Sequence, residues 1–90
     1  MGKKTMLFKS KERRGRSDVS AFLHQLADRI SVGQVVLRQG QEEIALELPQ
    51  NVTLEVQAKA DERREKGTRH RLELELTWSD DEREGSVELG

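Results

Sequence analysis

The sequence predicts an α+β fold in which one amphipathic helix packs on the apolar face of a mostly antiparallel twisted sheet of four or five strands. Between Ile44 and Trp78, nearly every apolar residue occupies an even position, and a period of two is typical of strands with one apolar face. Over residues 18–30, the apolar residues recur instead at intervals of three and four, which is typical of a helix. The predicted element order is β-α-β-β-β-β.

The chain begins with a basic segment, residues 1–16, which we interpret as an N-terminal arm. It holds seven Lys and Arg residues and one Glu, a net charge of +6, whereas residues 17–90 sum to −7. A positively charged arm on a negatively charged body can fold back onto that body, join molecules head to tail, or bind an anionic partner. Within it, residues 5–10 are a candidate short strand, with Met6 and Phe8 on one face.

The helix is predicted over Asp18–Ile30. Ser17 is a suitable N-cap, and Asp18 favours the positive end of the helix dipole. Gly33 is expected to end the helix, either in left-handed geometry or by opening the loop to the next strand.

Turn residues indicate the register of the first hairpin. Gly40 followed by Gln41 suits a two-residue type II′ turn, which would pair Leu37 with Ile44. A two-residue loop changes the positions that face inward from odd numbers before the turn to even numbers after it. The apolar residues change in the same way, from odd positions before the turn to even positions after it. The three-residue connection at 49–51 keeps that parity, so the next strand is expected to pair within the same sheet.

The last strand is predicted to follow a long polar loop, Asp61–Thr68. Pairing Ala58 with Leu72 would keep the apolar side chains on one face and end the strand at Trp78. Residues 79–90 are strongly charged and are interpreted as a disordered acidic tail. The remaining residues, 17–78, are predicted to form a single α+β domain. Its expected core includes Phe22, Leu26, Leu46, Leu54, Leu74 and Trp78.

Composition argues against most catalytic chemistry. The absence of Cys removes thiol nucleophiles and thiolate metal sites, and His24 and His70 have neither metal-ligand spacing nor an evident nucleophile partner. We therefore expect no catalytic residues, no metal and no cofactor, and a protein that is not an enzyme. With neither an apolar run long enough to span a bilayer nor a signal-peptide core, we expect no membrane association and a cytoplasmic location.

The lone helix, the strictly alternating strands and the closing Trp78 together resemble the amphi-Trp domain family, over about Met6 to Trp78. The resemblance implies the fold and an intracellular prokaryotic setting, and it supplies no catalytic residues. The arm looks richer in Lys and Arg than the family pattern.

Two surfaces are candidates for binding. The polar face of the sheet could bind a basic partner, and its edge strands could pair with another chain. The residues of this possible partner-binding face are Glu47, Glu55, Glu73, Glu75 and Arg71. The second surface is the arm, where Lys9, Lys11, Arg13, Arg14 and Arg16 could contact phosphates. Our first hypothesis is an interaction module for a protein partner or for itself, and the alternative is an accessory nucleic-acid-binding protein.

Overall fold

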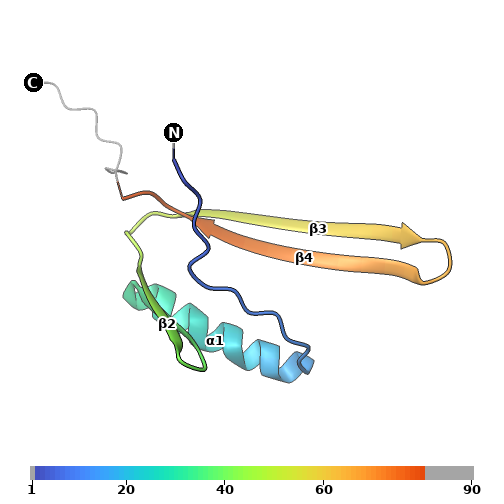
Figure 1. Ribbon diagram of the computed structural model, residues 1–90, viewed down its shortest axis with the longest axis horizontal. Coiled ribbons are helices and arrows are strands. Elements are labelled where there is room, and N and C mark those ends of the chain that lie inside the picture. Colours follow the sequence, from blue (N-terminus) through green and yellow to red (C-terminus); the bar gives the residue numbers. More distant parts are fainter. Residues whose placement is uncertain (1, 81–90) are drawn as a thin grey trace, which may run out of the picture. The chain divides into compact units, whose positions relative to one another are not determined.

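The computed structural model describes residues 2–80. Within these residues, one helix is followed by four strands, which form two antiparallel two-stranded sheets, β1–β2 and β3–β4 (Figure 1). The α+β class and the antiparallel pairing are therefore confirmed, whereas the single sheet of four or five strands is not. The elements are α1 (Arg16–Val32), β1 (Gln34–Gln39), β2 (Glu42–Glu47), β3 (Thr53–Arg63) and β4 (Gly67–Thr77).

The chain divides into two compact units, Met1–Leu48 and Pro49–Gly90. The domain predicted over residues 17–78 spans both units. The predicted tail at 79–90 lies almost entirely outside the described residues.

The arm contains no strand between residues 2 and 15, so the candidate strand at 5–10 is not formed. A short extended segment is stable as a strand only when a neighbour completes its hydrogen bonds, and the cations around this segment give it little apolar surface to bury. A hydrogen bond of 3.2 Å from Gln39 Nε2 to Glu12 Oε1 connects the arm to β1.

Helix α1 begins before and ends after the predicted range of 18–30. Its N-cap is Gly15, without a side-chain cap, so the prediction of Ser17 at this position is wrong. The C-terminal prediction is confirmed, because Gly33 adopts left-handed geometry with φ of 95°. Its N–H donates to the carbonyls of Arg29 and Ile30, both at 3.0 Å, which satisfies carbonyls that the helix itself leaves open.

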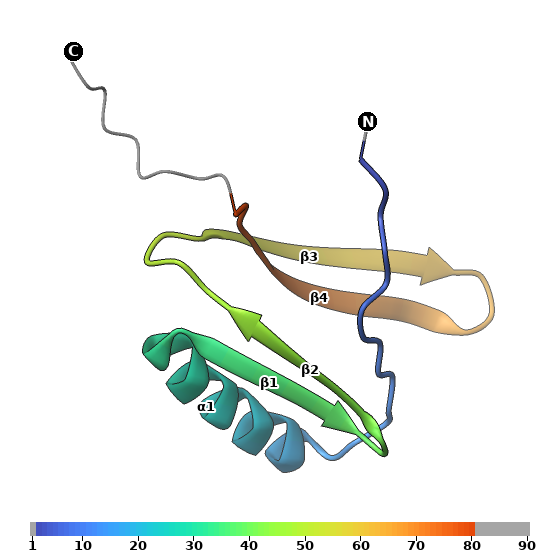
Figure 2. The same ribbon diagram turned by 60° about the vertical axis from the view of Figure 1, so that its left-hand side comes forward.

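The first unit combines α1 with the β1–β2 hairpin, and α1 packs against β1 (Figure 2). The predicted pairing of Leu37 with Ile44 is confirmed. Gly40 has φ of 61° and Gln41 has a negative φ, the combination that a type II′ turn requires. Val35 is 6% exposed and is the buried apolar residue of the described chain.

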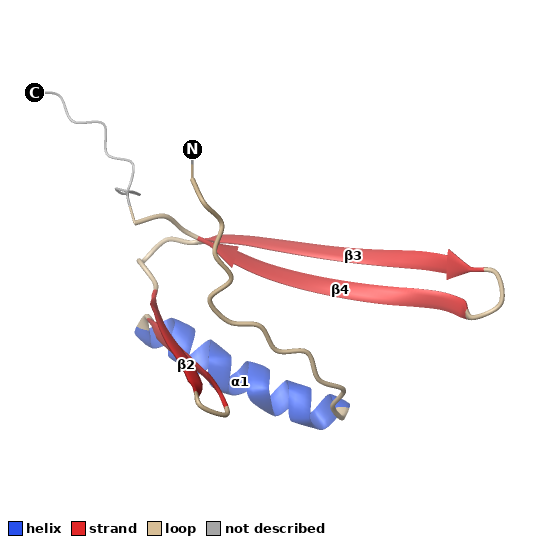
Figure 3. Cartoon of the chain, viewed as in Figure 1, coloured by secondary structure: helices blue, strands red, loops and turns tan. Residues whose placement is uncertain are grey.

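The second unit is the long β3–β4 hairpin (Figure 3). The predicted pairing of Ala58 with Leu72 is confirmed. The long loop predicted at Asp61–Thr68 is wrong, because the ladder continues until Arg63 faces Gly67. The extension keeps the alternation of faces, and its reversal uses the positive φ of 75° at Gly67.

The expected core is only partly covered. Three of its residues, Leu26, Leu46 and Trp78, are partly buried. The structure does not place the other three in a core, because Phe22 is 53%, Leu54 59% and Leu74 58% exposed.

Candidate functional site

Side chains on the β3–β4 hairpin alternate between two faces of opposite character. We call the odd-numbered positions of β3 and β4 the polar hairpin face and the even-numbered positions the apolar hairpin face. Because the register pairs odd with odd positions, polar or charged side chains face one another across the ladder as far as Asp61 and Arg69, and Arg63 faces Gly67. From the open end towards the turn, the polar pairs are Thr53–Thr77, Glu55–Glu75, Gln57–Glu73, Lys59–Arg71 and Asp61–Arg69.

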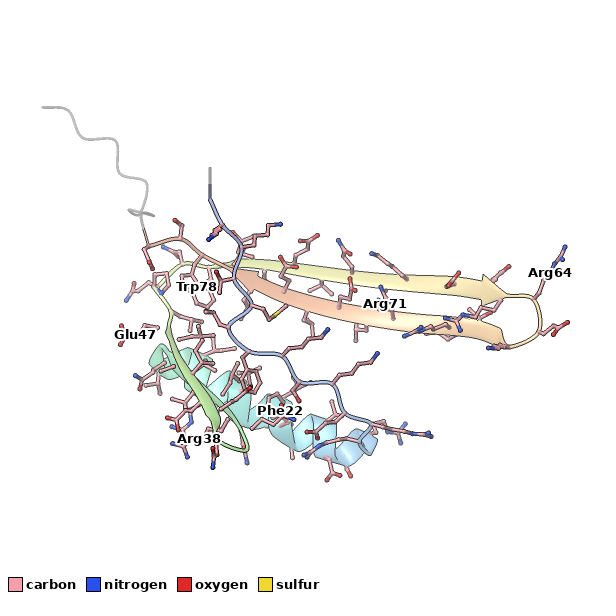
Figure 4. All side chains as sticks on the ribbon, viewed as in Figure 1. Phe22, Arg38, Glu47, Arg64, Arg71 and Trp78 are labelled. Atoms are coloured by element: carbon pink, nitrogen blue, oxygen red, sulfur yellow. The ribbon has the colours of Figure 1, made fainter. Side chains whose placement is uncertain are left out.

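Charge on the polar hairpin face is sorted along its length. Glu55 and Glu75 form a purely acidic pair near the open end, and Lys59 and Arg71 form a purely basic pair further along. Figure 4 shows Arg71 along β4 and Arg64 at the turn. Like charges directly opposite each other destabilise a strand pair, so the opposed Glu55–Glu75 pair does not serve the stability of the hairpin itself.

One ion pair inside the hairpin joins Arg63 Nε to Asp61 Oδ2 at 3.9 Å, and the others centre on Glu73. Its Oε2 lies 3.8 Å from Lys59 Nζ, and its Oε1 lies 3.5 Å from Arg71 Nη1. The side chains of these two Glu73 pairs are 43–58% exposed, so each pair contributes at most about 1 kcal/mol to stability. Glu75 and Arg69, by contrast, have no ion pair among residues 2–80.

The apolar hairpin face is largely exposed. Its cross-strand pairs include Val56–Leu74 and Ala58–Leu72, and Leu72 is 70% exposed. A two-stranded hairpin is marginally stable by itself, and each of its strands presents an outer edge of unpaired backbone groups. Both features favour association with further polypeptide.

The predicted partner-binding face is divided by the structure. Four of its residues, Glu55, Glu73, Glu75 and Arg71, lie together on the polar hairpin face. The fifth, Glu47, lies on β2 in the first unit, opposite Gln34.

Sequence reasoning missed the basic residues that the longer hairpin adds to this face. The loop was predicted over Asp61–Thr68, and Arg69, which directly follows it, was not included in the predicted polar face beside Arg71. The signal that could have indicated the longer strands is the alternation of polar and less polar residues, which continues past Ala58 with Ala60 and His70 at the even positions.

Over residues 2–16, the arm contains one internal ion pair, with Arg14 Nε 2.7 Å from Glu12 Oε2. The hydrogen bond to Glu12, followed by the charge of the same carboxylate, raises the pKa of Arg14 above its usual value. Among the other predicted arm residues, Lys9, Lys11 and Arg13 are exposed and have no ion pair among residues 2–80. Arg16 is the first residue of α1.

A hollow of about 450 Å³ lies between the arm, α1 and β1. Phe8 and Phe22 supply apolar lining, and Glu12 and Arg14 lie on its polar side. Glu12 already accepts hydrogen bonds from Arg14 and Gln39, so these three polar side chains of the hollow are used within the chain.

Within residues 2–80, no group of acidic or histidine side chains is arranged to hold a metal ion. No helix in that part of the chain combines the length and apolar character needed to cross a bilayer.

No curated protein and no solved structure matches this chain. The Amphi-Trp domain matches residues 1–90, so the chain belongs over its whole length to the Amphi-Trp domain family.

Proposed function

We propose that this protein is a small, non-enzymatic interaction module of the prokaryotic cytoplasm that binds a protein partner, or itself, through the β3–β4 hairpin. The observation that carries the proposal is the order of charges on the polar hairpin face, where the acidic Glu55–Glu75 and basic Lys59–Arg71 pairs face solvent. Such an arrangement costs stability in the isolated hairpin and is complementary to a partner with the reverse order.

The exposed strand edges support the same proposal, because they offer main-chain hydrogen bonds to an added strand while charged side chains select which strand is accepted. A single sheet that includes both hairpins remains part of this proposal. In such a sheet, the β1–β2 hairpin would pair with one edge of the β3–β4 hairpin, and the other edge would stay free for a partner.

The proposal is tested by light scattering and protein capture with the full chain. We expect the parent to self-associate or to retain a specific protein, and a variant with Glu73→Arg and Glu75→Arg to lose that interaction. The matched control reverses two exposed charges of the first unit, Asp28→Arg and Glu42→Arg, and should behave like the parent. Circular dichroism establishes that both variants are folded. A parent that is strictly monomeric and retains nothing, or equal retention by all three proteins, would overturn the proposal.

A second candidate function is nucleic-acid binding by the arm. It is supported by the three exposed cations Lys9, Lys11 and Arg13, whose charges are not neutralised by an ion pair among residues 2–80. Each phosphate that such a cation neutralises releases a counterion and makes affinity dependent on salt.

Replacing Lys9, Lys11 and Arg13 by Gln should remove most affinity for mixed-sequence DNA or RNA and lower the slope of log K against log salt by about 2 to 3. The control replaces Arg63, Arg64 and Lys66 at the hairpin turn by Gln, which changes the net charge equally. Fluorescence anisotropy at several salt concentrations measures both. Equal loss in the two variants would indicate a general charge effect and would count against a specific role for the arm.

A further inference from the structure

The charges along β4 form a self-complementary series. Arg69 and Arg71 precede Leu72, and Glu73 and Glu75 follow it at the same spacing, all four on the polar hairpin face. If β4 meets a second β4 in the opposite direction, with the two-fold axis at Leu72, each Arg71 faces a Glu73. Each Arg69 then faces a Glu75, so two attractive pairs are formed on either side of the axis.

The register of such a pair is selected by charge. In an antiparallel pair related by a two-fold axis normal to the sheet, directly opposed side chains share a face, so the axis must fall on a residue. An axis at Arg71 opposes that guanidinium with its own copy, and an axis at Glu73 opposes two carboxylates. The axis at Leu72 avoids both clashes.

The outer edge of β4 is available for pairing with another strand, and the charges of β4 are only partly balanced within the hairpin. β4 pairs with β3 on one side, and within this hairpin its other edge has no neighbour. In its own chain Glu75 faces Glu55, and Arg71 faces Lys59 and shares the single carboxylate of Glu73 with it. A second copy therefore places an opposite charge beside each β4 residue of these like-charged pairs.

We infer that the β4 edge is a homodimer interface, in which a second copy pairs antiparallel about Leu72 to give a four-stranded sheet β3-β4-β4-β3. The inference rests on the proposed function and specifies its partner. The β3 edge is less complementary, because an axis at Gln57 opposes Glu55 with Lys59 and forms no second pair of opposite charges.

Cysteine cross-linking of the full chain tests the register, because the natural sequence contains no Cys. With the axis at Leu72, the Cα atoms of the two residues lie about 4.5–5.5 Å apart, which a disulfide can bridge. Leu72→Cys should therefore give a covalent dimer under mild oxidation. Leu74→Cys is the control, because the two copies of residue 74 lie about 13 Å apart in this register and should not cross-link.

Charge reversal tests the interface in a second way. Glu75→Arg should weaken dimerisation about tenfold or more, because symmetry turns two attractive pairs into repulsive ones. Glu55→Arg relieves the same acidic pair inside the hairpin but lies on β3, so it should leave the dimer unchanged. Adding Arg69→Glu to Glu75→Arg restores opposite charges across the axis and should recover the dimer.

The outcomes separate this inference from the proposed function. A Leu72→Cys cross-link, together with loss and recovery in the charge variants, supports the β4 dimer. Cross-linking through Leu74→Cys or Gln57→Cys but not Leu72→Cys overturns it in favour of another register or edge. A parent that is monomeric at millimolar concentration but captures another protein through the hairpin overturns the dimer and leaves the interaction module standing.

Discussion

Val35→Asp should unfold the first unit. Val35 is 6% exposed on β1, where it pairs with Leu46, and β1 is the strand against which α1 packs. A carboxylate at this position has to be desolvated without a partner, which costs about 3–5 kcal/mol. Because a domain of this size has only about 5–10 kcal/mol of stability, a loss of this size removes much or all of it. Urea unfolding followed by the far-ultraviolet signal of α1 measures the change.

Val36→Asp is the matched control, because residue 36 lies on the opposite face of β1 and is 40% exposed. It introduces the same charge and the same loss of strand propensity, but the carboxylate stays in water, so we expect a cost below about 1 kcal/mol. Equal destabilisation by the two variants would contradict the assignment of faces on β1. Val35→Ala, with an expected cost of about 2 kcal/mol, gives a measurable value if Val35→Asp does not fold.

Sequence reasoning was most accurate where two independent constraints agreed. Gly40 fixed the length and type of the first turn, and the change of apolar parity from Leu37 to Ile44 required the same turn. The end of α1 was predictable for a similar reason, because Gly33 can adopt the left-handed geometry that closes the helix. The start of α1 was less predictable, since Ser17 and Gly15 are both acceptable N-caps and neighbouring structure decides between them.

The length of the second hairpin could not be predicted from apolar periodicity alone. Beyond Ala58 the even positions contain Ala60 and His70, which carry too little apolar surface to indicate a strand. The ladder is extended there by cross-strand pairs such as Asp61 with Arg69, which become visible only when the register is known.

The candidate site was predictable in part for the same reason. Alternation alone placed Glu55, Glu73 and Glu75 on a polar face, and the structure brings them together. The reversal of charge about Leu72 depends on Arg69 lying well inside β4, whereas the loop predicted over Asp61–Thr68 placed Arg69 at the very start of that strand. Glu47 was grouped with these residues only because all four strands were assumed to form one sheet.

Trp78→Ala is the second change for which we expect a large effect. The indole follows directly after the last hairpin pair, Thr53–Thr77, and is partly buried although it lies outside β4 itself. Removing a large aromatic side chain from a partly covered position should cost about 3 kcal/mol. For a chain of this size, that loss lowers the melting temperature by about 10–20 °C, which circular dichroism can follow.

The control variants separate packing from binding. Trp78→Phe keeps most of the apolar surface and should melt within a few degrees of the parent, whereas Thr77→Ala changes an exposed neighbour and should have little effect. If Trp78→Ala melts like the parent, the ring does not contribute to packing. Its remaining role is then that of an exposed platform on which a partner's ring or a nucleic-acid base stacks. Loss of partner capture or nucleic-acid binding without loss of stability would assign it that role, because a structural side chain cannot be removed at no cost to the melting temperature.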